Sequence, residues 1–276
     1  MKAIVQQAYG STEMLSYADA PMPVVGPEGV LIRVRSAGVD PGVWHMMTGL
    51  PLAGRLVLGL RKPKVAIRGW DVAGIVEGVG AQVTRFRRGD AVFGTTEGSF
   101  AEFACAPERK LQLKPSNLSF EEAAALPVSG TTALTGLRDV GGIQAGQRVL
   151  IIGAGGGVGH LAVQLAKHFG VEVTGVCSAA KAEFVTGLGA DHIIDYTAEK
   201  LSGSYDLILD MAGGRSLSEL RALLTPAGTL VLGGGEGGGR ILGSTERSIR
   251  ALFVTPSSGS GSAACCPCPS PNSSLY

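Results

Sequence analysis

The chain of 276 residues has little that would suggest a membrane, secreted or nucleic-acid-binding protein. It has no apolar run of about 18 residues without glycine or polar groups, and its start lacks the apolar core of a secretory signal. The net charge is only +1, from 24 basic and 23 acidic side chains. This balance does not favour binding to nucleic acid or to an anionic membrane. We therefore expect a cytoplasmic protein whose partner is a small molecule.

Cysteine is also scarce, and its spacing excludes a disulfide framework. Cys105 and Cys177 stand alone, and the other three crowd positions 265–268. Those three thiols lack a fourth ligand, so we expect no metal there. Residues 257–276 contain no charged side chain and are mostly Ser, Pro, Cys and Gly. Such a composition predicts a disordered tail.

Glycine, by contrast, is abundant, and the pattern around it divides the chain into two domains. There are 42 glycines, without the Gly-X-Y period of collagen. Residues 1–118 are predicted to form short strands separated by Gly and Pro, which is typical of a β-barrel-like domain. At Ser119 the sequence SFEE predicts a capping box that opens a helix. Strand and helix patterns then alternate over 119–256, which predicts a doubly wound parallel sheet.

The segment GAGGGVG, 153–159, carries the clearest candidate site. It follows a predicted strand and precedes a predicted helix, as in a dinucleotide-binding loop. A bare glycine-rich turn is the alternative, and the strand–loop–helix context favours cofactor binding. The predicted cofactor-binding residues of this loop are Ala154, Gly156, Gly157, Val158 and Gly159.

The residues after the next strand indicate which dinucleotide is bound. Enzymes that use NAD offer an Asp or Glu at the end of that strand, where this chain has Val176-Cys177-Ser178. Without that carboxylate, and with Ser178 and Lys181 able to donate to a 2′-phosphate, NADPH is the better fit. Tyr196 could add its hydroxyl. The alternative for Lys181 is an ordinary solvated helix lysine.

Four segments together resemble the medium-chain dehydrogenase/reductase superfamily. They are GWDVAGIVEGVG (69–80), RRGDAVFG (87–94), LSFEEAAALP (118–127) and VLIIGAGGGVGHLAVQLAK (149–167). The resemblance implies an N-terminal GroES-like catalytic domain and a C-terminal Rossmann domain that face each other across a cleft. It also implies that Lys181 and Tyr196 hold the 2′-phosphate.

Within this superfamily the chain is most similar to the zinc-free quinone oxidoreductase, or zeta-crystallin-like, branch. The positions that match the zinc ligands of alcohol dehydrogenases hold Asp40, Trp70-Asp71 and residues 126–128, without the thiolate and imidazole set that zinc prefers. We therefore expect no metal, and reduction of a quinone or an α,β-unsaturated carbonyl by NADPH. The resemblance places Asp40, His45 and Thr132 near the nicotinamide; turn capping and helix-end hydrogen bonding are their alternative roles.

The C-terminal part of the sequence leaves the completeness of the sheet and the function open. Family members continue past the point where this chain becomes rich in Ser, Pro and Cys, so we expect an incomplete sheet with an edge near 229–233. The rival function is an inactive dinucleotide-binding or structural relative, and an alcohol dehydrogenase-like activity is the runner-up among enzymes. A homodimer is possible.

Residues 55–68 carry five cations and are either a lid over the acceptor or a solvated loop.

Overall fold

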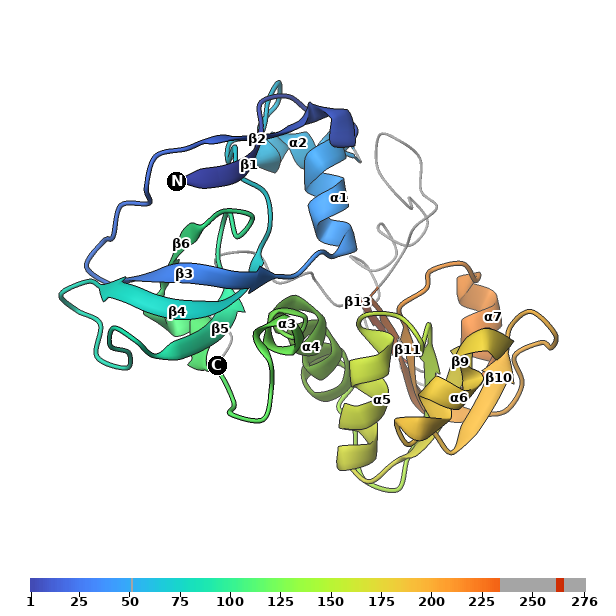
Figure 1. Cartoon of the computed structure of the whole chain (residues 1–276). Helices are drawn as coiled ribbons and strands as arrows, with labels where there is room; N and C mark the ends of the chain where they lie inside the picture. Colours follow the sequence, from blue (N-terminus) through green and yellow to red (C-terminus); the bar gives the residue numbers. More distant parts are fainter. Residues whose placement is uncertain (51, 234–261, 266–276) are drawn as a thin grey trace. The chain divides into compact units, whose positions relative to one another are not determined.

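The computed structural model describes residues 1–50, 52–233 and 262–265 of the chain (Figure 1). It divides into two compact units, of which the first is Met1–Val128 and the second begins at Ser129. The sequence places the domain boundary earlier, between 118 and 119. The intervening helix α3, Phe120–Ala124, buries Ala123 and Ala124 with Ala73 of the first unit, which is why it belongs there.

The first unit is built on an antiparallel sheet with strand order β6-β3-β4-β5-β7. Its strands are β3 Gly29–Ala37, β4 Asp71–Val79, β5 Ala91–Thr95, β6 Phe103–Pro107 and β7 Leu111–Leu113. A separate hairpin pairs β1, Lys2–Gln6, with β2, Leu15–Asp19. Branched and aromatic side chains such as Ile32, Val76 and Phe86 fill the core of the sheet. The β-rich architecture predicted for this region is confirmed.

Short helices connect these strands. The α-helices of this unit are α1 Pro41–Thr48, α2 Arg55–Leu58 and α3; the 3-10 turns are η1 Thr12–Met14, η2 Leu52–Gly54 and η3 Glu108–Lys110. Helix α3 starts with the predicted capping box, in which the Ser119 hydroxyl accepts from the Glu122 N–H and the Glu122 carboxylate accepts from the Ser119 N–H. This box satisfies two N–H groups that a helix start would otherwise leave unpaired.

The second unit contains a parallel sheet with strand order β10-β9-β8-β11-β12-β13. Its strands are β8 Arg148–Ile152, β9 Glu172–Cys177, β10 His192–Asp195, β11 Tyr205–Asp210, β12 Leu224–Leu232 and β13 Ser262–Cys265. The connecting helices are α4 Pro127–Leu134, the π-helical stretch η4 Thr135–Val140, α5 Gly159–His168, α6 Ala179–Gly187 and α7 Leu217–Ala222. Helix α4 begins at the division between the units. The doubly wound parallel sheet predicted from the alternating pattern is confirmed.

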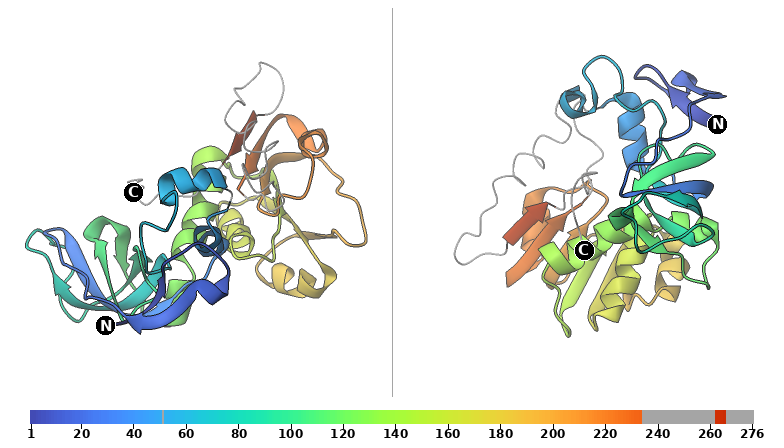
Figure 2. Two further views of the ribbon diagram at one scale, coloured as in Figure 1. Left: turned by 90° about the horizontal axis from the view of Figure 1, so that it is seen from above. Right: turned by 90° about the vertical axis from the view of Figure 1, so that its left-hand side faces the viewer.

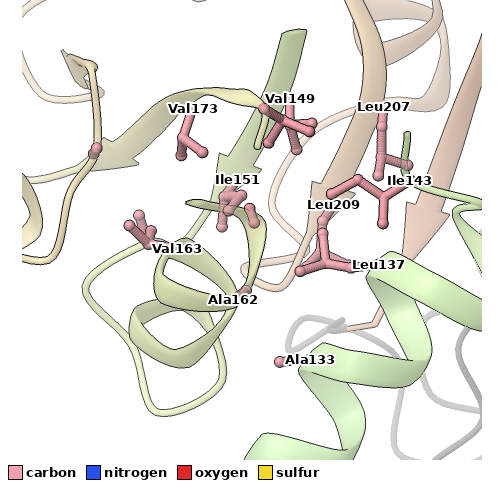
Figure 3. Close-up of a cluster of buried hydrophobic side chains, with 14 of the residues drawn as sticks. Ala133, Leu137, Ile143, Val149, Ile151, Ala162, Val163, Val173, Leu207 and Leu209 are labelled. Atoms are coloured by element: carbon pink, nitrogen blue, oxygen red, sulfur yellow. The ribbon is translucent and has the colours of Figure 1, made fainter. Parts of the chain in front are cut away.

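Both faces of this sheet are covered, which explains the nearly continuous apolar sequence of its strands. Val149 and Ile151 of β8 pack with Ala162 and Val163 of α5 on one face (Figure 3). Their neighbours along the strand, Leu150 among them, pack on the other face with residues of α7. Alternation along one strand thus supplies two cores.

The end of the sheet differs from the sequence expectation. Residues 262–265, predicted to be disordered with the rest of 257–276, form β13, which pairs in parallel with β12 (Figure 2). The strand expected at the edge, within 229–233, is therefore covered on its outer side. Because β12 offers a row of unpaired backbone groups, even a short Ser-Ala-Ala-Cys segment can add to it by main-chain hydrogen bonds alone. The other residues of that predicted tail lie outside the described part of the chain.

Candidate dinucleotide-binding site

The predicted dinucleotide loop joins β8 to α5 and is held by backbone hydrogen bonds. The N–H groups of Gly153 and Ala154 donate to the carbonyl oxygen of Val176, at the end of β9, over 3.1 and 3.0 Å. The Gly156 N–H donates to the Gly153 carbonyl oxygen over 2.9 Å. Gly153 adopts a φ of +84°, a conformation that favours glycine. The turn is thus fixed in place beside the neighbouring strand.

Gly159 begins α5 at a point where the chain leaves no room for a side chain. A Cβ atom there would lie 2.0 Å from the Gly153 carbonyl oxygen, whereas at Gly157 it would meet only the Ser129 hydroxyl at 3.7 Å. Within the described residues, no main-chain carbonyl outside the helix accepts a hydrogen bond from the N–H group of Gly157 or Val158. Free N–H groups at a helix start stabilise a phosphate, as a dinucleotide requires.

Lys181, on the first turn of α6, reaches this loop. Its ammonium donates to the Gly155 carbonyl oxygen over 2.8 Å, although the side chain is exposed. From the sequence alone, a lysine that contacts the loop cannot be distinguished from an ordinary solvated lysine. The contact places a positive charge beside the loop, where it could also bind a phosphate.

Ser178 and Tyr196 lie at the same end of the sheet as Lys181. Ser178 is the N-cap residue of α6, but its hydroxyl makes no capping hydrogen bond. Tyr196 follows β10, donates its N–H to the Cys177 carbonyl oxygen over 3.2 Å, and has a side chain that is 55% exposed. The three candidates for 2′-phosphate binding therefore come together at the carboxyl ends of β9 and β10.

This end of the sheet also holds a carboxylate that the sequence argument missed. Asp195, the last residue of β10, pairs in register with Cys177. Its carboxylate accepts from the Thr197 N–H and hydroxyl over 3.0 and 2.8 Å, and chiefly these bonds lower its pKa. The prediction of the cofactor rested on the end of β9 alone. The signal that could have revealed Asp195 is its position directly after the apolar run of the adjacent parallel strand.

In the first unit, Asp40 is the N-cap residue of α1. Its Oδ1 atom accepts from the N–H groups of Gly42 and Val43 over 2.6 and 3.3 Å. Its Oδ2 atom is buried and has no hydrogen-bond partner. The turn-capping role considered for Asp40 is thus present, and one carboxylate oxygen remains unsatisfied.

Asp71, at the start of β4, is a second acidic residue in this region and was not among the predicted site residues. It is 2% exposed, and its carboxyl oxygens accept the Val128 N–H over 3.2 and 3.3 Å. Burial, followed by the charge of Asp40, raises the pKa of Asp71 to about 7. The two carboxyl groups therefore interact, as paired acids in a shared site do. An acidic residue opening the apolar strand sequence DVAGIV was the available signal.

The other predicted catalytic residues lie in different units. His45 is exposed on the last turn of α1, and its Nδ1 atom lies 3.2 Å from the Leu50 carbonyl oxygen. Thr132 is a buried residue of α4 in the second unit. Asp40 caps the start of α1, whereas His45 lies on its last turn. Their catalytic roles stay predictions.

The described residues contain no group of three His, Cys, Asp or Glu side chains placed to bind a metal ion. No helix among them has the length and apolar character needed to cross a membrane.

Comparison with known families matches both units. Residues 26–116 match the alcohol dehydrogenase GroES-like domain, and residues 157–264 match the zinc-binding dehydrogenase family. The chain is 36% identical over 255 residues to 2-methylene-furan-3-one reductase of Solanum lycopersicum, covering 83% of this chain and 64% of the relative. It is 36% identical over 248 residues to a chloroplastic quinone-oxidoreductase homolog of Spinacia oleracea, covering 84% of this chain and 74% of the relative.

Solved structures agree with these matches. The quinone oxidoreductase of Coxiella burnetii superposes with a TM-score of 0.79 at 29% identity, covering 97% of this chain and 83% of that one. A mycobacterial protein in complex with NADPH superposes with a TM-score of 0.74 at 28% identity, covering 86% and 74%. On these matches, the chain belongs to the quinone oxidoreductase branch of the medium-chain dehydrogenase/reductase superfamily.

Proposed function

We propose that the chain is an NADPH-dependent oxidoreductase that transfers hydride to a quinone or an α,β-unsaturated carbonyl. The observation that carries this proposal is the loop 153–158, with its free N–H groups and with Lys181 beside it. NADPH, when bound, supplies the hydride. The chain's own residues bind the cofactor, orient it and exclude water from it.

The preference for NADPH over NADH rests on Lys181, Ser178 and Tyr196, which offer an ammonium and two hydroxyl groups at one end of the sheet. Asp195 is the opposing feature, because a carboxylate can bind ribose hydroxyls or repel a phosphate. Its bonds to Thr197 already occupy the Oδ1 atom. We propose that the positive charge of Lys181 outweighs the negative charge of Asp195.

The acceptor class rests on the relatives, whose names describe a methylene-furanone reductase and a quinone oxidoreductase homolog. In both substrates the incoming hydride places negative charge on a conjugated oxygen, so a hydrogen-bond donor is the main chemical requirement. The predicted donors are the His45 imidazole and the Thr132 hydroxyl. Asp40 is predicted, by the same resemblance, to lie near the nicotinamide.

We propose that this reaction needs no zinc. The positions that match the zinc ligands of alcohol dehydrogenases present the carboxyl groups of Asp40 and Asp71, without cysteine or histidine. Zinc prefers thiolate and imidazole ligands in such sites. Location in the cytoplasm and pairing into a homodimer stay predictions.

Removal of metal tests this point directly. After dialysis against a strong chelator, we expect NADPH oxidation in the presence of a quinone or an enone to proceed at its original rate, with less than one zinc per ten chains by metal analysis. An activity that falls with chelation and returns when zinc is added would contradict the zinc-free mechanism. NADPH binding without oxidation of any acceptor would instead favour an inactive relative.

A further inference from the structure

Arg68 is a buried cation with two guanidinium nitrogens that lack hydrogen-bond partners. It is 3% exposed, and both Nε and Nη2 are buried without a hydrogen-bond partner. Burial lowers its pKa. Even so, a guanidinium ion stays protonated in proteins because its ordinary pKa is so high. The first unit thus holds a permanent positive charge away from water.

No described carboxylate balances this charge. The ion pairs of the described residues use other arginines, and Tyr9 is the one ionisable group that acts electrostatically on Arg68. Burial raises the pKa of Tyr9, so its phenol is neutral at physiological pH. The Tyr9 hydroxyl also donates to the Gly59 carbonyl oxygen over 2.7 Å. Tyr9 therefore cannot serve as the counter-ion.

A second arginine adds to the positive charge. The Arg55 guanidinium lies 4.4 Å from the centre of the Tyr9 ring, and its Nε donates to the Gly49 carbonyl oxygen over 3.0 Å. Arg55 and Arg68 both lower the pKa of Tyr9, so the phenol lies within the field of two cations. A buried charge without a partner destabilises the folded chain. What this region lacks is an anion.

The unpaired atoms also indicate the shape of that anion. Nε and Nη2 form one edge of the planar guanidinium, and their N–H groups are parallel, which matches two oxygens of one carboxylate or phosphate. The Ser99 hydroxyl is likewise buried without a partner. A Cβ built at Gly69, next to Arg68, would lie 2.3 Å from that hydroxyl oxygen. The Ser99 hydroxyl, a further donor, therefore lies beside Gly69, the residue that follows Arg68 in the chain.

We propose that Arg68 is the centre of an oxyanion-binding site in the first unit, which takes a carboxylate or a phosphate group through the Nε–Nη2 edge. The site belongs to the segment 55–68, which the sequence presents as either a lid or a solvated loop. It does not depend on the oxidoreductase function, because it uses none of the residues assigned to the cofactor or to hydride transfer.

Thermal unfolding of the full chain tests this proposal, with acetate and inorganic phosphate as probes and chloride at matched ionic strength as the reference. A saturating rise in Tm is expected with one or both probes. An anion at ten times its Kd multiplies the folding equilibrium constant by about 11. In Arg68→Gln the rise with acetate should be lost, and the rise with phosphate should fall to what the dinucleotide loop contributes. Without anion this variant should unfold at a higher Tm than the wild type, because an unpaired buried charge has been removed.

Two matched variants separate this site from other cationic groups. Arg61→Gln removes an exposed cation of the same segment, and Lys181→Met removes the one beside the dinucleotide loop. Arg61→Gln should keep the full rise, and Lys181→Met should keep the rise with acetate and lose only the part of the phosphate rise that comes from the dinucleotide loop. If Arg68→Gln does not fold, NMR titration of the wild-type protein with ¹³C-acetate or phosphate replaces the comparison of melting temperatures. Lys181→Met is the control in that titration. The absence of saturable binding by both probes, or an unchanged rise in Arg68→Gln, would overturn the proposal; the tighter probe identifies the group bound.

Discussion

Asp71 illustrates how burial turns a common side chain into a pH-sensitive one. Its pKa is about 7 in the folded chain and about 4 in an unfolded chain, so between these values the folded state binds more protons. Stability must therefore fall as pH rises from about 4 to about 7. A protonated Asp71 carboxyl group can donate a hydrogen bond, which an ionised one cannot. The unpaired Oδ2 atom of Asp40 is an acceptor for that bond.

Asp71→Asn is expected to remove this pH dependence. The amide has the shape of the protonated acid and can donate where the carboxylate cannot, so the variant should be more stable than the wild type above pH 7. The difference should approach about 4 kcal/mol at most, since one pKa unit corresponds to about 1.4 kcal/mol. Urea unfolding at several pH values measures it, with the exposed Asp19→Asn as the control. A difference that stays constant with pH would show that Asp71 is ionised in the folded chain.

Among single residues, we predict that Lys181 carries the cofactor preference. Lys181→Ala should weaken NADPH binding about tenfold, the loss of one charge-assisted hydrogen bond, and leave NADH binding nearly unchanged. Fluorescence titration with each cofactor provides the two dissociation constants. Lys200→Ala, which removes an exposed lysine after β10, is the control. An equal loss for both cofactors would mean that Lys181 only supports the loop through Gly155.

At the scale of elements, the strand–loop–helix unit of β8 and α5 depends on Gly159. Gly159→Ala should destabilise the chain by about 1–3 kcal/mol, because its Cβ would lie 2.0 Å from a main-chain oxygen that cannot move without breaking the loop. Gly157→Ala is the matched control, because its Cβ would make only an ordinary contact. Chemical denaturation compares the two variants. Equal stability of both would contradict the close packing.

The sequence was a good guide to elements whose signal is local. Capping at Ser119, the glycine loop and the alternation of strands and helices each follow from a few neighbouring residues. Three features depended on distant contacts. Helix α3 joins the first unit because two alanines pack on β4, β13 adds to an edge by backbone pairing, and Asp195 approaches Cys177 only through strand order. No local pattern encodes these contacts.

The surroundings of Asp40 and Arg68 were the least predictable for the same reason. Asp40 was found by family resemblance, but its interaction with Asp71 requires β4 and the start of α1 to come together in space. Arg68 was noticed only as one of five cations, because burial, unlike charge, cannot be read from a loop segment.

At the scale of the whole molecule, we propose that this chain itself transfers hydride. Its tomato relative is longer, with 64% of its length matched, so turnover must be measured on the chain as it stands. The direct measurement uses NADPH that carries deuterium as its transferable hydride, with an enone as acceptor, and mass spectrometry of the product. We predict one deuterium on the β-carbon of the reduced product for each NADPH oxidised. Binding of NADPH without deuterium in the product would contradict the claim and leave a dinucleotide-binding protein.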